Sequence, residues 1–170
     1  MSPPARSEAA KAVEGRGFAL LGRTLEAVVV FAFVALVVVA FAQVVFRYAL
    51  GNSLSWAEEV SRYLFVWIVF LAAAIAVDKG SHIAVDSLQG ALGERARAVL
   101  QIALGVCIGV FLVVVTWKSL SLARLAMIER APASGVPLGL VQMAMPIGMV
   151  LMLLYTARGI LRRVRDLRRG

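Results

Sequence analysis

The sequence predicts an all-α integral membrane protein that crosses the bilayer four times. Hydrophobic residues make up 61% of the 170 residues, more than the roughly 45–50% that is usual in soluble domains. They are concentrated in four blocks, each close to the roughly 20 helical residues that cross a hydrocarbon core of about 30 Å. The blocks lack the alternating polar and apolar residues of barrel strands, so helices are predicted.

The four predicted spans differ in polarity. They cover residues 25–46, 56–77, 98–117 and 136–157. The first, third and fourth contain few ionisable side chains. The second is unusual because its opening turns contain Glu58, Glu59 and Arg62. Charges near the centre of a membrane helix cost about 2.5–3.5 kcal/mol each, so these three are expected to face protein or water instead of lipid.

The basic residues predict that both termini lie in the cytoplasm. Thirteen of the 18 Lys and Arg residues fall before the first span, between the second and third, or after the fourth. Cytoplasmic loops carry such an excess. We therefore expect a cytoplasmic tail over 1–24, a membrane domain over 25–157 and a basic cytoplasmic tail over 158–170. Topology thus accounts for the net charge of +8, with no nucleic-acid partner; a patch for anionic lipid or a partner is the alternative for the last tail.

The connection between the second and third spans predicts a short cytoplasmic interfacial helix. Apolar residues recur there at helical spacing from Val85 to Val99. The segment also contains His82, the only histidine of the chain, and Asp86. Metal and haem sites need several ligands, so a lone histidine predicts neither, and no cofactor or metal is expected.

The segment before the second span predicts a turn and a helix start. Gly51 and Asn52 are turn-forming residues. Ser55 followed three positions later by Glu58 fits a capping box, so the second helix is expected to begin near Ser55. Within that helix, Glu58 and Arg62 stand at i and i+4 and are expected to pair.

A longer set of motifs carries a family resemblance. It consists of Phe46-Arg47-Tyr48, the run from Asn52 to Glu59, Arg62-Tyr63-Leu64, Trp67, Gly80, His82-Ile83 and Asp86. In order and spacing these motifs resemble the small permease subunit of tripartite ATP-independent periplasmic (TRAP) transporters. Pro146-Ile147-Gly148 in the last span extends the resemblance, whereas Val141-Gln142-Met143 departs from the aromatic residues frequent there in that family.

The resemblance implies a non-catalytic subunit of a secondary transporter in the bacterial inner membrane. Such a transporter also has a large permease subunit and a periplasmic solute-binding protein, and it imports an organic acid with a cation gradient, usually sodium. The small subunit widens the static scaffold in the lipid bilayer. No catalytic, substrate-binding or metal-binding residue is expected here. The candidate partner-interface residues are Arg47, Asn52, Ser53, Trp56, Glu58, Glu59, Arg62, Tyr63, Trp67, His82 and Asp86.

The charged cluster of Glu58, Glu59 and Arg62 has two possible roles in such a complex. In one, the glutamates neutralise Arg62 and the group anchors the helix start against the large subunit. In the other, the glutamates face the periplasm and help to dock the solute-binding protein. The first is favoured because Arg62 pairs within its own helix and Trp67 lies on a nearby face as a packing anchor.

Two other functions fit the sequence less well than this interpretation, and a third remains as the alternative. A standalone cation-coupled exporter needs an ionisable residue near mid-membrane, but Glu26 lies at a helix end. A haem-binding electron-transfer subunit needs two inward histidines, and His82 lies outside the spans. A structural four-span partner of another membrane complex remains the alternative. The identity of the transported solute is not indicated by the sequence.

Overall fold

The computed structural model describes residues 3–52, 54–79 and 94–167 and is helical throughout its main elements. The helices are α1 (Pro3–Ala49), α2 (Ser55–Asp78), α4 (Glu94–Leu125), α5 (Leu138–Gln142) and α6 (Ala144–Leu167). Four segments are long and apolar enough to cross a membrane, namely Gly17–Ala49, Ser55–Asp78, Val99–Leu125 and Leu138–Arg162. The prediction of an all-α protein with four spans is therefore confirmed.

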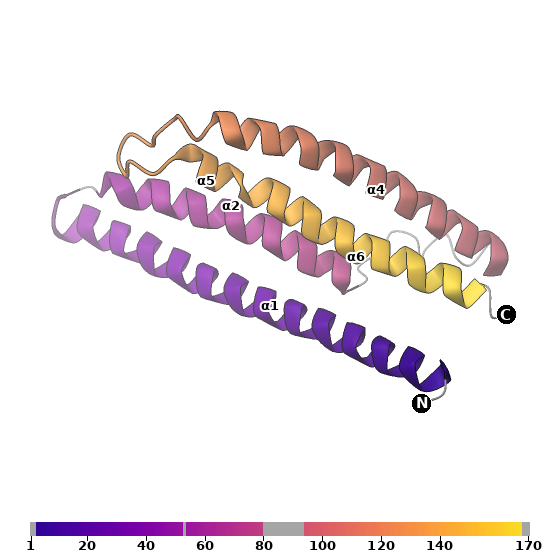
Figure 1. The fold of residues 1–170 in the computed structure, drawn as a ribbon. Coiled ribbons are helices and arrows are strands. Elements are labelled where there is room, and N and C mark those ends of the chain that lie inside the picture. The colour runs from indigo at the N-terminus through magenta and orange to yellow at the C-terminus, as the bar shows by residue number, and fades with distance from the viewer. Residues whose placement is uncertain (1–2, 53, 80–93, 168–170) are drawn as a thin grey trace.

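The long helices lie side by side in a single row, in the order α1, α2, α6, α4 (Figure 1). Helix α6 lies inside the row and contributes the largest share of buried residues among the four spans. Helix α1 forms one edge, and none of its side chains from residue 17 onward is buried. Phe31, for example, is 76% exposed. An open row of this kind leaves broad apolar faces for lipid or for other subunits.

Antiparallel helices give the row two distinct ends (Figure 1). We call the end formed by residues 50–54 and 126–137 the loop end. The end at which α1 begins and α6 ends is the terminal end. An even number of crossings places both termini of the bundle on one side, as predicted, but which side is cytoplasmic remains a prediction. The predicted interfacial helix falls on residues 80–93, outside the described residues.

The tail predicted over 1–24 is helical from its third residue. Helix α1 begins at Pro3 and runs without interruption to Ala49. Proline is tolerated in the first turn of a helix because the N–H that it lacks has no intrahelical partner there. No helix was predicted for this segment, since its mixed charges obscure the apolar pattern. The span itself, predicted over 25–46, lies within the helix.

The turn between α1 and α2 has the expected residues. Gly51 has a φ of +65°, a conformation that glycine adopts without a steric penalty. The N–H of Asn52 donates to the Phe46 carbonyl at 3.1 Å and closes the end of α1. Helix α2 then begins at Ser55, where the sequence predicted its start.

Helix α4 extends eight residues beyond the predicted span, to Leu125. The N–H groups of Met127 and Ile128 then donate to carbonyls three residues back, at 3.3 and 3.4 Å, which is a tightening of the last turn. The chain folds into a compact loop, with a hydrogen bond from Ala131 N–H to the Val136 carbonyl at 2.9 Å. The helix thus ends well before Pro132.

The fourth span is divided into two helices. Met143 separates α5 from α6, and Pro146 is the third residue of α6. Because proline has no N–H, the carbonyl of Gln142 cannot receive the usual i to i+4 hydrogen bond. This interruption divides the fourth span near its loop end.

Glycines allow close contact between α6 and its two neighbours. A Cβ placed on Gly148 would lie 2.8 Å from the Cβ of Phe70 on α2. A Cβ on Gly105 of α4 would lie 2.9 Å from a side-chain carbon of Ile160. Small residues at membrane helix interfaces permit such approach and increase van der Waals contact. Gly148 and Gly105 thus permit close packing of α6 against α2 and α4.

Candidate functional site

The predicted charged cluster at the start of α2 is divided in the structure. Arg62 pairs with Glu58 through Nη2 and Oε1 at 3.1 Å, as the i, i+4 spacing predicted. Both side chains are about two-thirds exposed, at 65% and 66%. The pair therefore projects from the row and remains available to another molecule. A surface pair of this kind contributes only about 0–1 kcal/mol to stability.

Glu59 has a different role, because its carboxylate holds the loop that follows α4. Its Oε1 accepts the backbone N–H of Ala133 at 3.0 Å. Its Oε2 accepts the backbone N–H of Ser134 at 2.8 Å and the Ser134 hydroxyl at 2.7 Å. Three hydrogen bonds to one carboxylate are charge-assisted and directional. Glu59 therefore fixes the loop against α2.

The predicted capping box is wrong. The N-cap of α2 is Leu54, and no side chain caps the helix. Ser55 is already the first helical residue, whereas a capping side chain has to come from the non-helical residue before it. Glu58, the expected second partner, reaches forward to Arg62.

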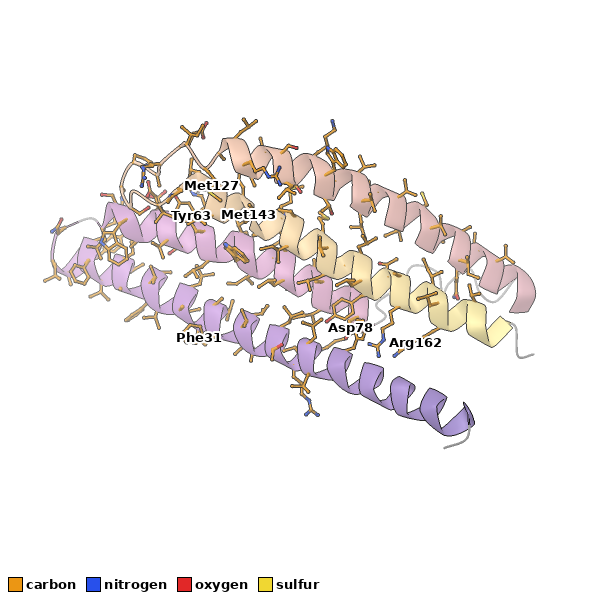
Figure 2. All side chains as sticks on the ribbon, in the orientation of Figure 1. Phe31, Tyr63, Asp78, Met127, Met143 and Arg162 are labelled. Atoms are coloured by element: carbon orange, nitrogen blue, oxygen red, sulfur yellow. The ribbon has the colours of Figure 1, made fainter. Side chains whose placement is uncertain are left out.

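The other predicted interface residues gather at the loop end. Arg47 and Asn52 are exposed around the first turn, and Trp56 is 47% exposed. Tyr63 and Trp67 are half-buried on α2, and Figure 2 shows Tyr63 in the loop-end part of the row. Ser53, His82 and Asp86 lie outside the described residues. The described candidates except Trp67, which lies midway along α2, thus share one end of the molecule.

The terminal end holds a second polar cluster that the sequence analysis did not identify. Asp78, at the end of α2, and Arg158 of α6 approach to 3.8 Å. The guanidinium of Arg158 also lies 4.1 Å from the ring centre of Phe18 on α1, which is a cation–π contact. Phe18 packs against Tyr155, with ring centroids 6.1 Å apart. Arg158 thus connects three helices.

Glu26 belongs to the same end. Its carboxylate pairs with Lys79 at 2.8 Å and links α1 to the residue after α2. The carboxylate considered for a mid-membrane cation site is therefore in an ion pair near the terminal end. Both ion pairs, Asp78 with Arg158 and Glu26 with Lys79, join opposite charges near the ends of predicted spans. That pattern of charges was the feature of the sequence from which they could have been predicted.

The described polar groups mainly join helices and loops. Within residues 3–52, 54–79 and 94–167, no three His, Cys, Asp or Glu side chains come together in a way that could hold a metal ion. The described polar groups connect helices and loops to one another at the two ends of the row. The ion pair of Glu58 and Arg62 is exposed, as are large apolar surfaces.

Comparison with known proteins gives one consistent result. A protein of Haemophilus influenzae that carries the name of a TRAP transporter small permease protein is 32% identical over 114 residues, 67% of this chain and 71% of its own length. The isethionate TRAP transporter permease protein DctMQ of Oleidesulfovibrio alaskensis is 30% identical over 99 residues, 57% of this chain but 16% of that protein. The C4-dicarboxylate TRAP transporter small permease protein DctQ of Vibrio cholerae is 29% identical over 87 residues, 49% of this chain and 38% of that protein.

A family description covers most of the chain as well. Residues 36–166 match the family described as tripartite ATP-independent periplasmic transporters, DctQ component. The matched range begins inside α1 and extends almost to the end of α6, so it includes the last part of α1, the other three long helices, both turns of the loop end, and Asp78, Tyr155 and Arg158 of the terminal end. The chain is therefore a multi-pass membrane protein that belongs to the small permease (DctQ) family of TRAP transporters.

Proposed function

We propose that this chain is the small membrane subunit of a TRAP-type secondary transporter in a bacterial inner membrane. It works with a large permease subunit and a periplasmic solute-binding protein to import an organic acid, driven by a cation gradient, with sodium as the coupling ion. The observation that carries the proposal is the family match over residues 36–166. The transporter relatives support the organic-acid substrate class, since one is named for C4-dicarboxylates.

The partnership with a large subunit is supported by the lengths of the relatives. In DctMQ the matched segment makes up only 16% of the permease. A sialic acid TRAP transporter permease protein, SiaT of Haemophilus influenzae, is matched over 14% of its length. In such a fused protein, one small segment is always present for each large permease. A separate small chain such as this one would reach the same arrangement by binding to a large permease subunit.

The geometry of the row supports a scaffold role. Gly148 and Gly105 bring α6 close to both neighbours, and polar contacts fix each end. Such helices do not slide without breaking several contacts at once. The exposed edge helix α1 and the open faces give the large subunit apolar surface to bind. Movement for transport then belongs to the partner, against this static row.

The loop end is proposed to face the periplasm, since the distribution of basic residues places the termini in the cytoplasm. Glu58, Arg62 and Trp56 would then form part of the surface that contacts the large subunit. The rival role, docking of the solute-binding protein by the glutamates, requires the same exposure. Glu58, exposed in its ion pair with Arg62, is the glutamate that could serve it, because Glu59 is engaged by the loop.

Co-purification and reconstitution test the proposal. The tagged chain, expressed with the neighbouring genes of its own host, should retain a large permease subunit in mild detergent. Proteoliposomes holding both subunits should take up an organic acid only with a sodium gradient and the solute-binding protein. Vesicles lacking this chain are the control. Transport by the chain alone would refute the scaffold role, and stable co-purification with an unrelated complex would favour the structural-partner alternative.

A further inference from the structure

An open groove runs along α4 beside its contact with α6, on the side not used for helix packing. It has a volume of about 480 Å³, and its lining includes Val113, Trp117, Leu120, Ser121 and Arg124 of α4 and Leu153 of α6. Sites for small molecules usually have volumes of about 300–1,000 Å³. The groove is thus large enough for a small molecule or for a single acyl chain.

The groove changes character along its length. Arg124, in the last turn of α4, is the one charged residue of the lining and lies at the loop end. Ser121 and Trp117 follow one and two turns deeper, and the inner part is lined by Val113 and Leu153. Tryptophan and arginine are typical of the membrane–water interface. The polar end therefore lies where lipid headgroups are and the apolar part where acyl chains are.

The depth of the groove fits one leaflet. Val113 is eleven residues from Arg124, or about 16 Å at about 1.5 Å per residue. Half of a hydrocarbon core of about 30 Å is about 15 Å. A second, apolar hollow of about 310 Å³ continues from Val113 and Leu153 towards Gly105 and Ile160. An acyl chain held by its headgroup at Arg124 therefore has apolar surface along its whole length.

Charge complementarity identifies the headgroup class. Arg124 takes part in none of the ion pairs formed among the described residues. A guanidinium binds phosphate through paired N–H donors. We propose that this groove binds one anionic phospholipid of the loop-end leaflet, with the phosphate on Arg124 and one acyl chain lying past Trp117 to Val113. The site is independent of the role proposed for the transporter complex.

A helix from another subunit is the competing occupant, and the observations favour lipid. A helix with its side chains has a diameter of about 10–12 Å. To pack here, it would also have to place a negatively charged group opposite Arg124 at one end of the groove. The order of groups along the groove, one cation, a hydroxyl and an indole, then an apolar channel one leaflet deep, is the order of groups in a phospholipid.

Photolabelling tests the site in the intact complex. The chain, purified with its accompanying subunits, is placed in vesicles that contain a trace of phosphatidylglycerol with a diazirine in its acyl chain. Label on peptides covering 113–124 is quantified by mass spectrometry, against competing unlabelled phosphatidylglycerol or phosphatidylcholine. Phosphatidylglycerol should compete about fivefold better, the factor that corresponds to about 1 kcal/mol for one basic residue near the surface.

Matched variants locate the effect. Arg124→Gln should abolish the preference for phosphatidylglycerol, whereas Lys118→Gln, which removes an exposed cation of α4 outside the groove, should leave it unchanged. Val113→Trp, which fills the apolar path and keeps Arg124, should reduce labelling. Leu122→Trp, on the exposed surface beside the groove, should not.

Three results would overturn the proposal. One is equal competition by both lipids in the unaltered protein, which would indicate ordinary boundary lipid. Another is a preference that survives Arg124→Gln. The third is a photo-crosslinking residue at Ser121 that joins this chain to a large subunit while the lipid probe fails to label 113–124, which would mean that protein covers the groove.

Discussion

Replacing Gly148 with alanine should push α2 and α6 apart. The new Cβ would lie 2.8 Å from the Cβ and 3.0 Å from the carbonyl oxygen of Phe70. Carbon atoms pack best at about 3.5–4.0 Å, so the carbon pair is too close by about 0.7–1.2 Å. Neither Phe70 atom is at the flexible end of a side chain, so relief requires movement of a helix. Overpacking of this kind costs about 1–3 kcal/mol.

A second glycine in the same helix supplies the matched control. A Cβ on Gly159 would meet nothing within 4 Å. Alanine is better than glycine in a helix interior by about 1 kcal/mol, and this gain applies equally to Gly148→Ala and Gly159→Ala. Gly159→Ala should therefore be neutral or stabilising. The difference between the two variants isolates the crowding and should be about 1–3 kcal/mol.

Titration with SDS in mixed micelles measures this difference. Unfolding is followed by far-ultraviolet circular dichroism, and the apparent free energies of the two variants are compared under one set of conditions. The reasoning is refuted if Gly148→Ala is as stable as Gly159→Ala, because α2 and α6 would then not be in close contact at Phe70. Gly109→Ala, whose Cβ would lie 4.0 Å from Leu153, should behave like the control.

Three further predictions concern the loop end and the topology. Glu59→Gln should speed amide hydrogen exchange at Ala133 and Ser134 several-fold, since an amide side chain keeps one acceptor in place of two carboxylate oxygens, whereas Glu58→Gln should leave those amides unchanged; equal exchange in both variants would contradict the role of Glu59. Arg62→Ala should change the stability of the chain by no more than about 0–1 kcal/mol but weaken its binding to the large subunit; an intact, thermally unchanged complex that loses salt-sensitive transport would instead support docking of the solute-binding protein. A reporter fused after Gly170 should be active only as a cytoplasmic type, and alkaline phosphatase activity from that position would overturn the orientation.

The sequence predicted the spans well because one physical requirement determines them. An apolar block long enough to cross the hydrocarbon core forms a helix, because its backbone N–H and C=O groups must hydrogen-bond within the segment. The spans predicted over 25–46 and 56–77 lie within α1 and α2, differing only in how far each helix continues. The extension of α4 to Leu125 is consistent with this logic, since residues outside the core are not constrained by lipid.

The capping box failed for a local reason. Two residue types at the right spacing satisfy the pattern, but the geometry depends on which residue is the last non-helical one. Here that residue is Leu54, so Ser55 is placed one position too late to act as the cap. Glu58 is then free to pair with Arg62, which the i, i+4 spacing also predicts. The carboxylate of Glu58 could serve either in a capping box with Ser55 or in an ion pair with Arg62, and the structure has the ion pair.

The contacts of Glu59 and Arg158 could not be read from local patterns. Glu59 and Ser134 are 75 residues apart in the chain, and their contact depends on α2 and the end of α4 meeting at the same depth beside α5. The sequence identified Glu59 as a charge needing a partner but offered Arg62, the nearest one. Asp78 and Arg158 were hidden by similar separation, although their opposite charges stand at the same end of two parallel spans, α2 and α6.

These contacts explain how the described helices hold together in an open row in which Tyr155 is the one buried aromatic side chain among the described residues. In water, a four-helix protein would close into a bundle to bury its apolar faces, but lipid removes that driving force. The position of each helix relative to its neighbours then has to be fixed by close packing and by directional polar contacts. Gly148 and Gly105 provide the first along α6, Glu59 provides the second at the loop end, and Arg158 provides it at the terminal end. The ion pair of Glu26 and Lys79 joins α1 to the end of α2. Because each neighbouring pair in the row is then held by at least one of these contacts, the row keeps its shape while its faces stay open, which is what the proposed static subunit beside a moving partner requires.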